Sequence, residues 1–239
     1  MALQKLNIVS KTFSNVNGRL FSLSTTVAKT FREKYRDFWT PKPRFVPPYE
    51  HFTQVGDPVL RTEAALVPQE LVDSKEVRLV TDRMIKILHK YDCVGVAAPQ
   101  VGVSLRIIAL EFHEGKKEQF SEAVYKARKM STFPLTVVIN PVLKVTDYSL
   151  HKHPEGCMSV RGFTAEVERY DSVLLTGLDR KGAPLELKLN GWNARIAQHE
   201  MDHLNGKLYI DTMDRATFAC TCWQVINNKG GRVEIPFYK

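Results

Sequence analysis

The chain has 239 residues, 44% of them hydrophobic, which is enough to bury the core of one domain of ordinary size. No apolar run approaches the roughly 20 residues that cross a bilayer, so we expect no membrane span. The net charge of +8 lies almost wholly in residues 1–44, which hold nine Lys or Arg against two acids, and the nearly neutral remainder argues against direct binding of nucleic acid.

The first 44 residues have the composition of a targeting segment. Up to Arg32 they contain no acidic residue, and their Ser and Thr residues are mixed with Lys, Arg, Phe and Leu. This composition is typical of a transit peptide, with a disordered basic tail as the alternative. Prolines at positions 41, 43, 47 and 48 then indicate an extended linker. We therefore expect a transit peptide and linker over residues 1–44 and one catalytic domain over residues 45–239.

The next stretch predicts a core helix followed by a shaped loop. Apolar residues recur at helical spacing from Val77 to Tyr91, and Asp73 with Glu76 resembles a capping box at the start of that helix. Residues 95–102 contain a proline between two glycines and cannot continue as helix. The charged insert over residues 113–130 is expected at the surface.

The second half of the chain predicts strands around one helix. Asn190 is the expected N-cap of a helix over residues 192–204, which the Asn205-Gly206 pair ends. Residues 179–182 predict a hairpin turn, and Gly230-Gly231 predicts a second turn. The expected fold is α+β, with antiparallel strands packed around a central helix. The predicted strands are 105–112, 135–140, 163–170, 173–178, 185–189, 218–226 and 232–237.

The clearest motif lies inside this central helix. His199-Glu200-Met201-Asp202-His203 has the H-E-x-x-H pattern of metal hydrolases. Side chains at i and i+4 project from one face of a helix, so His199 and His203 can reach the same ion. Glu200 can reach a water molecule on that ion and is the candidate general base. Two satisfied core histidines are the alternative, but a stripe with a glutamate between two histidines makes a poor core.

Two histidines leave a metal ion short of a third protein ligand, and Cys157 is the best candidate for it. It lies in the segment E-G-C-M-S at 155–159, where Gly156 permits close approach of the backbone. The other three cysteines are expected to be ordinary reduced thiols, and Cys220 and Cys222 alternate on one face of a predicted strand.

Three separated segments together resemble the peptide deformylase family. The family motifs have the forms G-x-G-x-A-A-P-Q, E-G-C-x-S and Q-H-E-x-D-H, and the chain has, in this order, C-V-G-V-A-A-P-Q at 93–100, E-G-C-M-S at 155–159 and Q-H-E-M-D-H at 198–203. The resemblance covers about residues 48–230. The run G-W-N-A-R at 191–195 is similar to the organellar, mitochondrial-type branch of the family.

The resemblance implies a metal-dependent hydrolase that removes the N-formyl group from the N-terminal methionine of nascent mitochondrially made polypeptides and releases formate. It implies that Cys157, His199 and His203 bind one divalent metal ion and that Glu200 transfers the proton. A thiolate and two imidazoles suit Zn²⁺, Fe²⁺, Co²⁺ or Ni²⁺, and the family implies Fe²⁺.

The resemblance also implies how the substrate is held. The side-chain amide of Gln100 and the backbone N–H of Met158 are expected to stabilise the oxyanion, and the backbone of Gly95 is expected to align the peptide. The expected partners are formyl-methionyl peptides and nascent chains, with the mitochondrial ribosome as a candidate partner. The expected location is the mitochondrial matrix.

Two other functions fit parts of the sequence. A zinc metalloprotease shares the H-E-x-x-H pattern, although such enzymes commonly take a third ligand downstream of the helix and Asp211 and Asp214 follow at other spacings. A non-catalytic ribosome-associated factor with the same fold is the third hypothesis. It is opposed by the fact that every expected catalytic position is filled.

Overall fold

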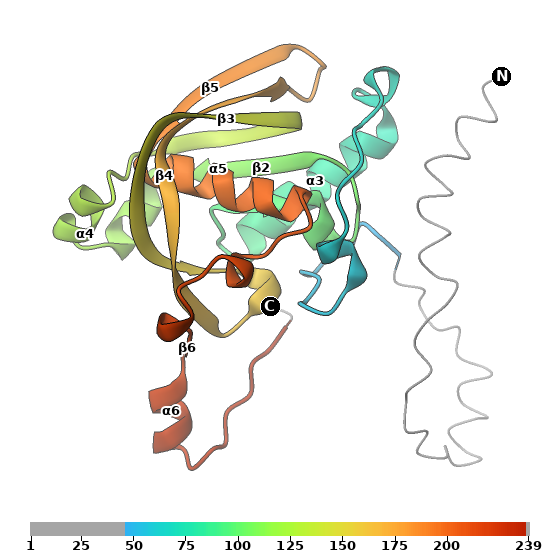
Figure 1. The fold of residues 1–239 in the computed structure, drawn as a ribbon. Coiled ribbons are helices and arrows are strands. Elements are labelled where there is room, and N and C mark those ends of the chain that lie inside the picture. The colour runs from blue at the N-terminus through green and yellow to red at the C-terminus, as the bar shows by residue number, and fades with distance from the viewer. Residues whose placement is uncertain (1–45, 238–239) are drawn as a thin grey trace, which may run out of the picture. The chain divides into compact units, whose positions relative to one another are not determined.

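A computed structural model describes residues 46–237, and the predicted leader and linker over residues 1–44 lie outside this range. The described residues from Pro48 onward form one compact unit. An antiparallel sheet in the order β1-β2-β3-β4-β5 makes its frame, and β6 pairs with β4 (Figure 1). The strands are β1 (Gly95–Ala97), β2 (Ile107–Phe112), β3 (Phe133–Gly156), β4 (Phe163–Leu178), β5 (Pro184–Asn190) and β6 (Ala219–Cys220).

Helix α5 (Gly191–Leu204) confirms the predicted central helix, and the strands curve around it (Figure 1). Its apolar residues pack against β2, β3 and β4 in the main core cluster, which includes Ala194, Ala197, Met201 and Leu204. The helix begins at Gly191 with φ 52°, where a Cβ atom would lie 2.6 Å from the carbonyl oxygen of Lys129, so only glycine fits there. The α+β fold class is confirmed.

Helix α3 (Lys75–Lys90) confirms the first predicted helix and buries Met84, Ile87 and Leu88. The predicted capping box is wrong, because Ser74 occupies the N-cap and its Oγ accepts a hydrogen bond from the Val77 N–H at 3.2 Å. Asp73 instead pairs with Arg78 at the surface. A similar correction applies to Asn190, which stands at the N-cap of α5 but makes no capping hydrogen bond through its side chain.

Strands β3 and β4 are much longer than the sequence predicts. Residues 141–156 carry no apolar alternation, yet they continue β3 because they pair along nearly their whole length with β4. The predicted strands 163–170 and 173–178 are one strand, and the polar Asp171 that interrupts the pattern is paired with Lys129. The turn at 179–182 is confirmed by the hydrogen bond from the Asp179 N–H to the Ala183 carbonyl.

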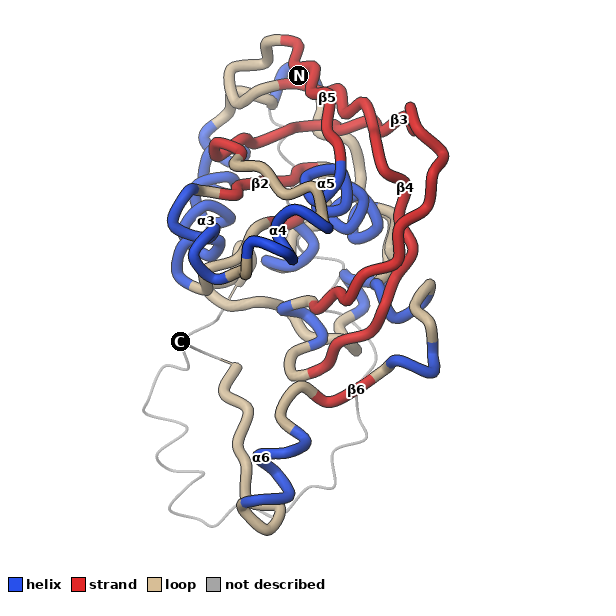
Figure 2. Tube along the Cα trace, turned by 90° about the vertical axis from the view of Figure 1, so that its left-hand side faces the viewer, coloured by secondary structure: helices blue, strands red, loops and turns tan. Residues whose placement is uncertain are grey.

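The prediction of strands at 218–226 and 232–237 is wrong. Only Ala219–Cys220 is a strand, helix α6 (Trp223–Asn228) follows it, and residues 232–237 form no regular element. The apolar residues that suggested strands, among them Trp223 and Phe237, are about half exposed because no core lies beside them. The charged insert contains a short helix, α4 (Glu122–Ala127), which lies at the left-hand edge of the molecule in Figure 1 and faces the viewer in Figure 2. Within residues 46–237 no helix is both long and apolar enough to cross a membrane.

The N-cap of α3 gives a first prediction. Ser74→Ala removes the only side-chain acceptor at this helix start, so the free energy of unfolding should fall by about 1 kcal/mol. Asp73→Ala removes only an exposed ion pair and should change it by less than about 0.5 kcal/mol. Urea unfolding followed by circular dichroism measures both variants, and equal losses would contradict the assignment of Ser74 as the cap.

Candidate metal centre

The C-terminal half of α5 supplies two histidines and a glutamate to the interior. His203 is 1% exposed and Glu200 is 4% exposed, and the rings of His199 and His203 lie with centroids 5.1 Å apart. The i and i+4 spacing brings both rings to one side of the helix, as the motif requires. Burial of three ionisable groups on one helix is costly unless something neutralises or binds them.

Cys157 approaches the two histidines from the segment that follows β3. It is the N-cap of the short 3-10 helix η5 (Met158–Val160), and its Sγ lies 3.3 Å from Nε2 of His203. One ligand atom from each of Cys157, His199 and His203 lies within 4.8 Å of the other two. In the part of the chain that the structure describes, no other group of three such residues is arranged in this way. One thiolate and two imidazoles are a donor set for a tetrahedral divalent ion with one open position.

The carboxylate of Glu200 lies beside this cluster with one oxygen unused. Its Oε2 is buried and has no hydrogen-bond partner among the described residues. Burial, with a smaller contribution from the charge of Glu155, raises the pKa of Glu200 to about 7. A carboxyl group with such a pKa and a free oxygen can accept and return a proton near neutral pH.

Gly95 faces Glu200 from β1. A Cβ atom at position 95 would lie 2.4 Å from Oε1 of Glu200, so only glycine leaves room for this carboxylate. β1 is an edge strand of the sheet, because β2 is its single neighbour in the strand order. An edge strand offers free backbone groups to an extended peptide.

The side chain of Gln100 is oriented by the backbone. Its Oε1 accepts a hydrogen bond from the Ala97 N–H at 2.9 Å, so its NH₂ group must point the other way. That group donates to Sγ of Cys157 at 3.4 Å and to Oγ of Ser159 at 3.2 Å. Met158 follows Cys157 directly as the first residue of η5. The structure thus brings together all seven residues that the sequence singles out.

Glu155 contacts His199, one of the three candidate metal ligands, on the side of its Nδ1 atom. Its Oε2 lies 2.9 Å from Nδ1 of His199, and Arg169 forms a two-point contact with both carboxylate oxygens at 3.0 Å each. Arg195 adds a third contact, from Nη1 to Oε1 at 2.7 Å. Burial alone would raise the pKa of Glu155, but the hydrogen bonds from His199 and Arg169 outweigh it and hold that pKa far below its usual range. Glu155 is therefore a permanent anion that fixes the ring of His199.

The two histidines differ in their electrostatic surroundings. Burial disfavours the charged form of His199, yet its hydrogen bonds to Cys157 and Glu155 hold its pKa well above the usual value. Burial and the neighbouring His199 and Arg169 hold the pKa of His203 well below it. The carboxylate of Glu155 thus favours a positive charge at His199, and a proton and a divalent cation compete for this position.

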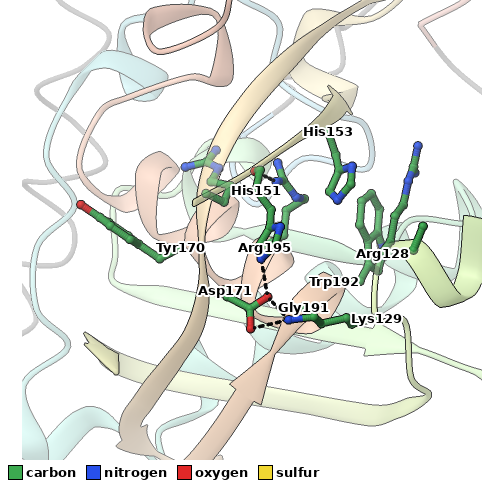
Figure 3. Close-up of a pocket in the computed structure, with 11 residues that line it drawn as sticks. Arg128, Lys129, His151, His153, Tyr170, Asp171, Gly191, Trp192 and Arg195 are labelled. Carbon is green, nitrogen blue, oxygen red and sulfur yellow. Dashed lines mark hydrogen bonds and ion pairs between the residues drawn. The ribbon is translucent and has the colours of Figure 1, made fainter. Parts of the chain in front are cut away.

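Sequence reasoning missed both arginines. Arg195 lies one helical turn before His199, so the i to i+4 spacing that connects His199 with His203 also includes it, and this signal could have been used. Arg169 comes from β4, and no sequence pattern connects it with Glu155. Both arginines also line a cavity at the N-terminal end of α5, where Lys129 pairs with Asp171 (Figure 3), and Cys157 is not among the residues that line it.

The acidic residues downstream of the helix are engaged elsewhere. Asp211 pairs with Arg61 at 2.5 Å, and Asp214 pairs with Lys152 at 2.7 Å. Asp202, inside the motif, accepts a hydrogen bond from Nη1 of Arg169 at 2.5 Å. None of these carboxylates belongs to the cluster of three possible ligands, so the third-ligand position of a metalloprotease is not filled by them.

Comparisons with known proteins point to one family. A family model described as polypeptide deformylase matches residues 49–219. The chain is 42% identical to the human mitochondrial peptide deformylase over 198 residues, which are 81% of this chain and 82% of that relative. It is 46% identical to the chloroplastic/mitochondrial peptide deformylase 1A of Arabidopsis thaliana over 166 residues, 68% of this chain and 61% of that relative. A Met-Ala-Ser-bound peptide deformylase structure from Acinetobacter baumannii matches with a TM-score of 0.60 and 28% identity, covering 68% of this chain and 96% of that chain.

The contact between Glu155 and His199 gives a second prediction. Glu155→Gln keeps the shape but removes the charge that two guanidinium groups and an imidazole share, so affinity for Co²⁺ should fall about 10- to 100-fold. Titration of the metal-free protein followed by visible absorption measures this. Glu168→Gln, on the exposed face of β4, is the matched control and should bind like the parent. Equal affinity of Glu155→Gln and the parent would show that Glu155 does not support the ligand.

Proposed function

This chain belongs to the polypeptide deformylase family, and on that basis we propose that Cys157, His199 and His203 hold the divalent ion while Glu200 transfers the proton. The enzyme removes the N-formyl group from an N-terminal methionine. The observation that carries the assignment of roles is the buried, unpartnered Oε2 of Glu200 beside the three converging ligands. The family match answers the metalloprotease alternative, which predicted a protein of another family, and the formate assay described below tests the non-catalytic alternative.

The chemistry requires an activated water molecule and a group to handle its proton. When bound, the ion supplies Lewis acidity and lowers the pKa of a water molecule at its open position. Glu200 accepts the proton of the attacking water and returns it to the nitrogen of methionine as the C–N bond to the formyl carbon breaks. Because the pKa of Glu200 is raised to about 7, it is suited to both transfers near neutral pH.

The developing negative charge on the formyl oxygen needs donors at a fixed place. The NH₂ group of Gln100 is held toward Cys157 because its Oε1 is bound to the Ala97 N–H, so it meets the substrate without having to reorient. The N–H of Met158 is the second donor. Gly95 has two roles. Its backbone on the open edge of β1 can pair with an extended peptide, and the absence of a side chain leaves room for Glu200.

The identity of the metal ion is a further part of the proposal. The family is metal-dependent, and the cysteine and two histidines fit several divalent ions. We assign Fe²⁺ as the ion in the cell. The mitochondrial relative supports an organelle as the location, and the basic leader supports the matrix. Nascent chains made in that compartment, and the ribosome that makes them, are then the proposed partners.

The third prediction separates holding the metal from using it. Glu200→Gln keeps all three ligands, so the protein should retain its metal while formate release from formyl-Met-Ala-Ser falls by roughly 10²- to 10⁴-fold. Cys157→Ala deletes a ligand, so metal content and turnover should fall together. Metal analysis and a formate assay on the same samples decide the matter. Near-normal turnover of Glu200→Gln, or undiminished metal binding by Cys157→Ala, would contradict this division of roles.

The fourth prediction concerns the leader. Residues 1–44 carry nearly all of the net charge and lie before the part that matches the family, so they should direct a fluorescent fusion into mitochondria. A chain that begins at Phe45 should keep full formate release in vitro. Fluorescence spread evenly through the cytosol would contradict the targeting role, and an inactive truncated chain would contradict the domain boundary.

A further inference from the structure

The thiols of Cys220 and Cys222, near the C-terminus, are in contact with each other. Sγ of Cys220 and Sγ of Cys222 are 3.4 Å apart, and both cysteines are free thiols that are partly exposed. Cys220 is the last residue of β6 and Cys222 is the N-cap of α6, so the chain turns between them. The sequence predicts a continuous strand at this point. The turn instead brings the two sulfur atoms together, within the distance of an S–H hydrogen bond.

The turn is held in place by the sheet. The Thr221 N–H donates to the Gly162 carbonyl at 2.9 Å, and the Thr221 hydroxyl donates to the same oxygen at 3.2 Å. Cys220 is in register with Phe163 of β4, and the rings of Phe163 and Phe218 stack with centroids 5.1 Å apart. Because these contacts fix β6 and Thr221, the residue between the two cysteines, the thiols are held close together at a high effective concentration.

The other two cysteines are unsuited to the same chemistry. Burial, and to a lesser degree the charge of Glu200, raises the pKa of Cys93 to about 12, so its reactive thiolate form is scarce. Cys157 is one of the three candidate metal ligands. Among the described residues, Cys220 and Cys222 are therefore the pair that is both accessible and in mutual contact.

We propose that Cys220 and Cys222 form a thiol–disulfide exchange site that reacts with low-molecular-weight disulfides such as glutathione disulfide. In the first step the thiolate of one of the two cysteines attacks one sulfur atom of the disulfide, its S–S bond breaks, and one thiol leaves after taking up a proton. In the second step the other cysteine, having lost its proton, attacks the Sγ that carries the adduct and releases the second thiol. The protein loses two hydrogen atoms and the disulfide gains them, so atoms and electrons balance.

The contact is symmetric, since either sulfur can donate the hydrogen bond, so either thiol can attack first while the other resolves the mixed disulfide. A disulfide between residues two apart closes a small ring, and strained disulfides are the readily reduced ones. The exchange is therefore reversible. The site lies beside Gly162, outside the group of residues that hold the metal or the substrate.

Peptide mapping of the full-length, Ni²⁺-loaded enzyme tests the proposal without any substitution. After incubation with glutathione disulfide, the peptide with Cys220 and Cys222 should lose two hydrogen atoms, and Cys93 should remain a thiol as the internal control. Excess reduced glutathione should restore both thiols. Failure of the pair to oxidise, or stable glutathione adducts on the parent chain in place of the internal disulfide, would overturn the proposal.

Two substitutions test whether the two thiols act as a unit. Cys222→Ser lacks a partner thiol that could resolve the mixed disulfide, so it should accumulate at least about tenfold more glutathione adduct on Cys220 than the parent does. Cys220→Ser lacks the partner thiol in the same way and should accumulate the adduct on Cys222. Unchanged formate release by both reduced variants reports that they are folded. Equal adduct levels in the parent and in Cys222→Ser would show that the two thiols do not act as a unit.

Discussion

The negative charge of Glu155 in the protein interior is the constraint on which the rest of the site depends. A buried carboxylate is tolerated only when hydrogen bonds and opposite charges replace its water, and three different elements meet at this one. Glu155 comes from the end of β3, Arg169 from β4, and Arg195 and His199 from α5. The same contacts therefore dock the helix into the curved sheet and orient its first histidine. Removing one partner would leave an uncompensated charge, so the packing of β3, β4 and α5 depends on all of these contacts at once.

The free groups of the interior lower the stability of the metal-free chain. Oε2 of Glu200 and Nδ1 of His203 are buried and have no hydrogen-bond partner within residues 46–237, and each such atom costs free energy that a satisfied or apolar core would not lose. A divalent ion with its water gives the cluster new bonds that the unfolded chain cannot offer. Metal binding is thus coupled to folding, and the metal-free chain should be the less stable form.

How much the sequence predicts depends on whether the signal is local. Helix α5 could be predicted because His199 and His203 share a helical spacing with the buried apolar residues, and Cys157 because it stands in a short motif with glycine beside it. The long pairing of β3 with β4 could not, since residues 141–156 are stabilised by their partner strand more than by apolar residues of their own. The role of Arg169 could not be predicted either, because it depends on Glu155 in the neighbouring strand. Conversely, the apolar residues after 218 looked like strands, but no core is available for them to pack against.

The three proposed ligands differ in how firmly the chain holds them. His199 and His203 are part of a buried helix whose hydrogen bonds break only when a large part of the domain opens, whereas Cys157 lies in a short segment between β3 and β4. Local opening of such a segment needs less free energy than opening of a core helix. A bound ion would then lose the sulfur of Cys157 first and the two nitrogens afterwards. The lifetime of that bound ion would be set by the motion of residues 157–162, and slow metal exchange would report on the rigidity of this segment.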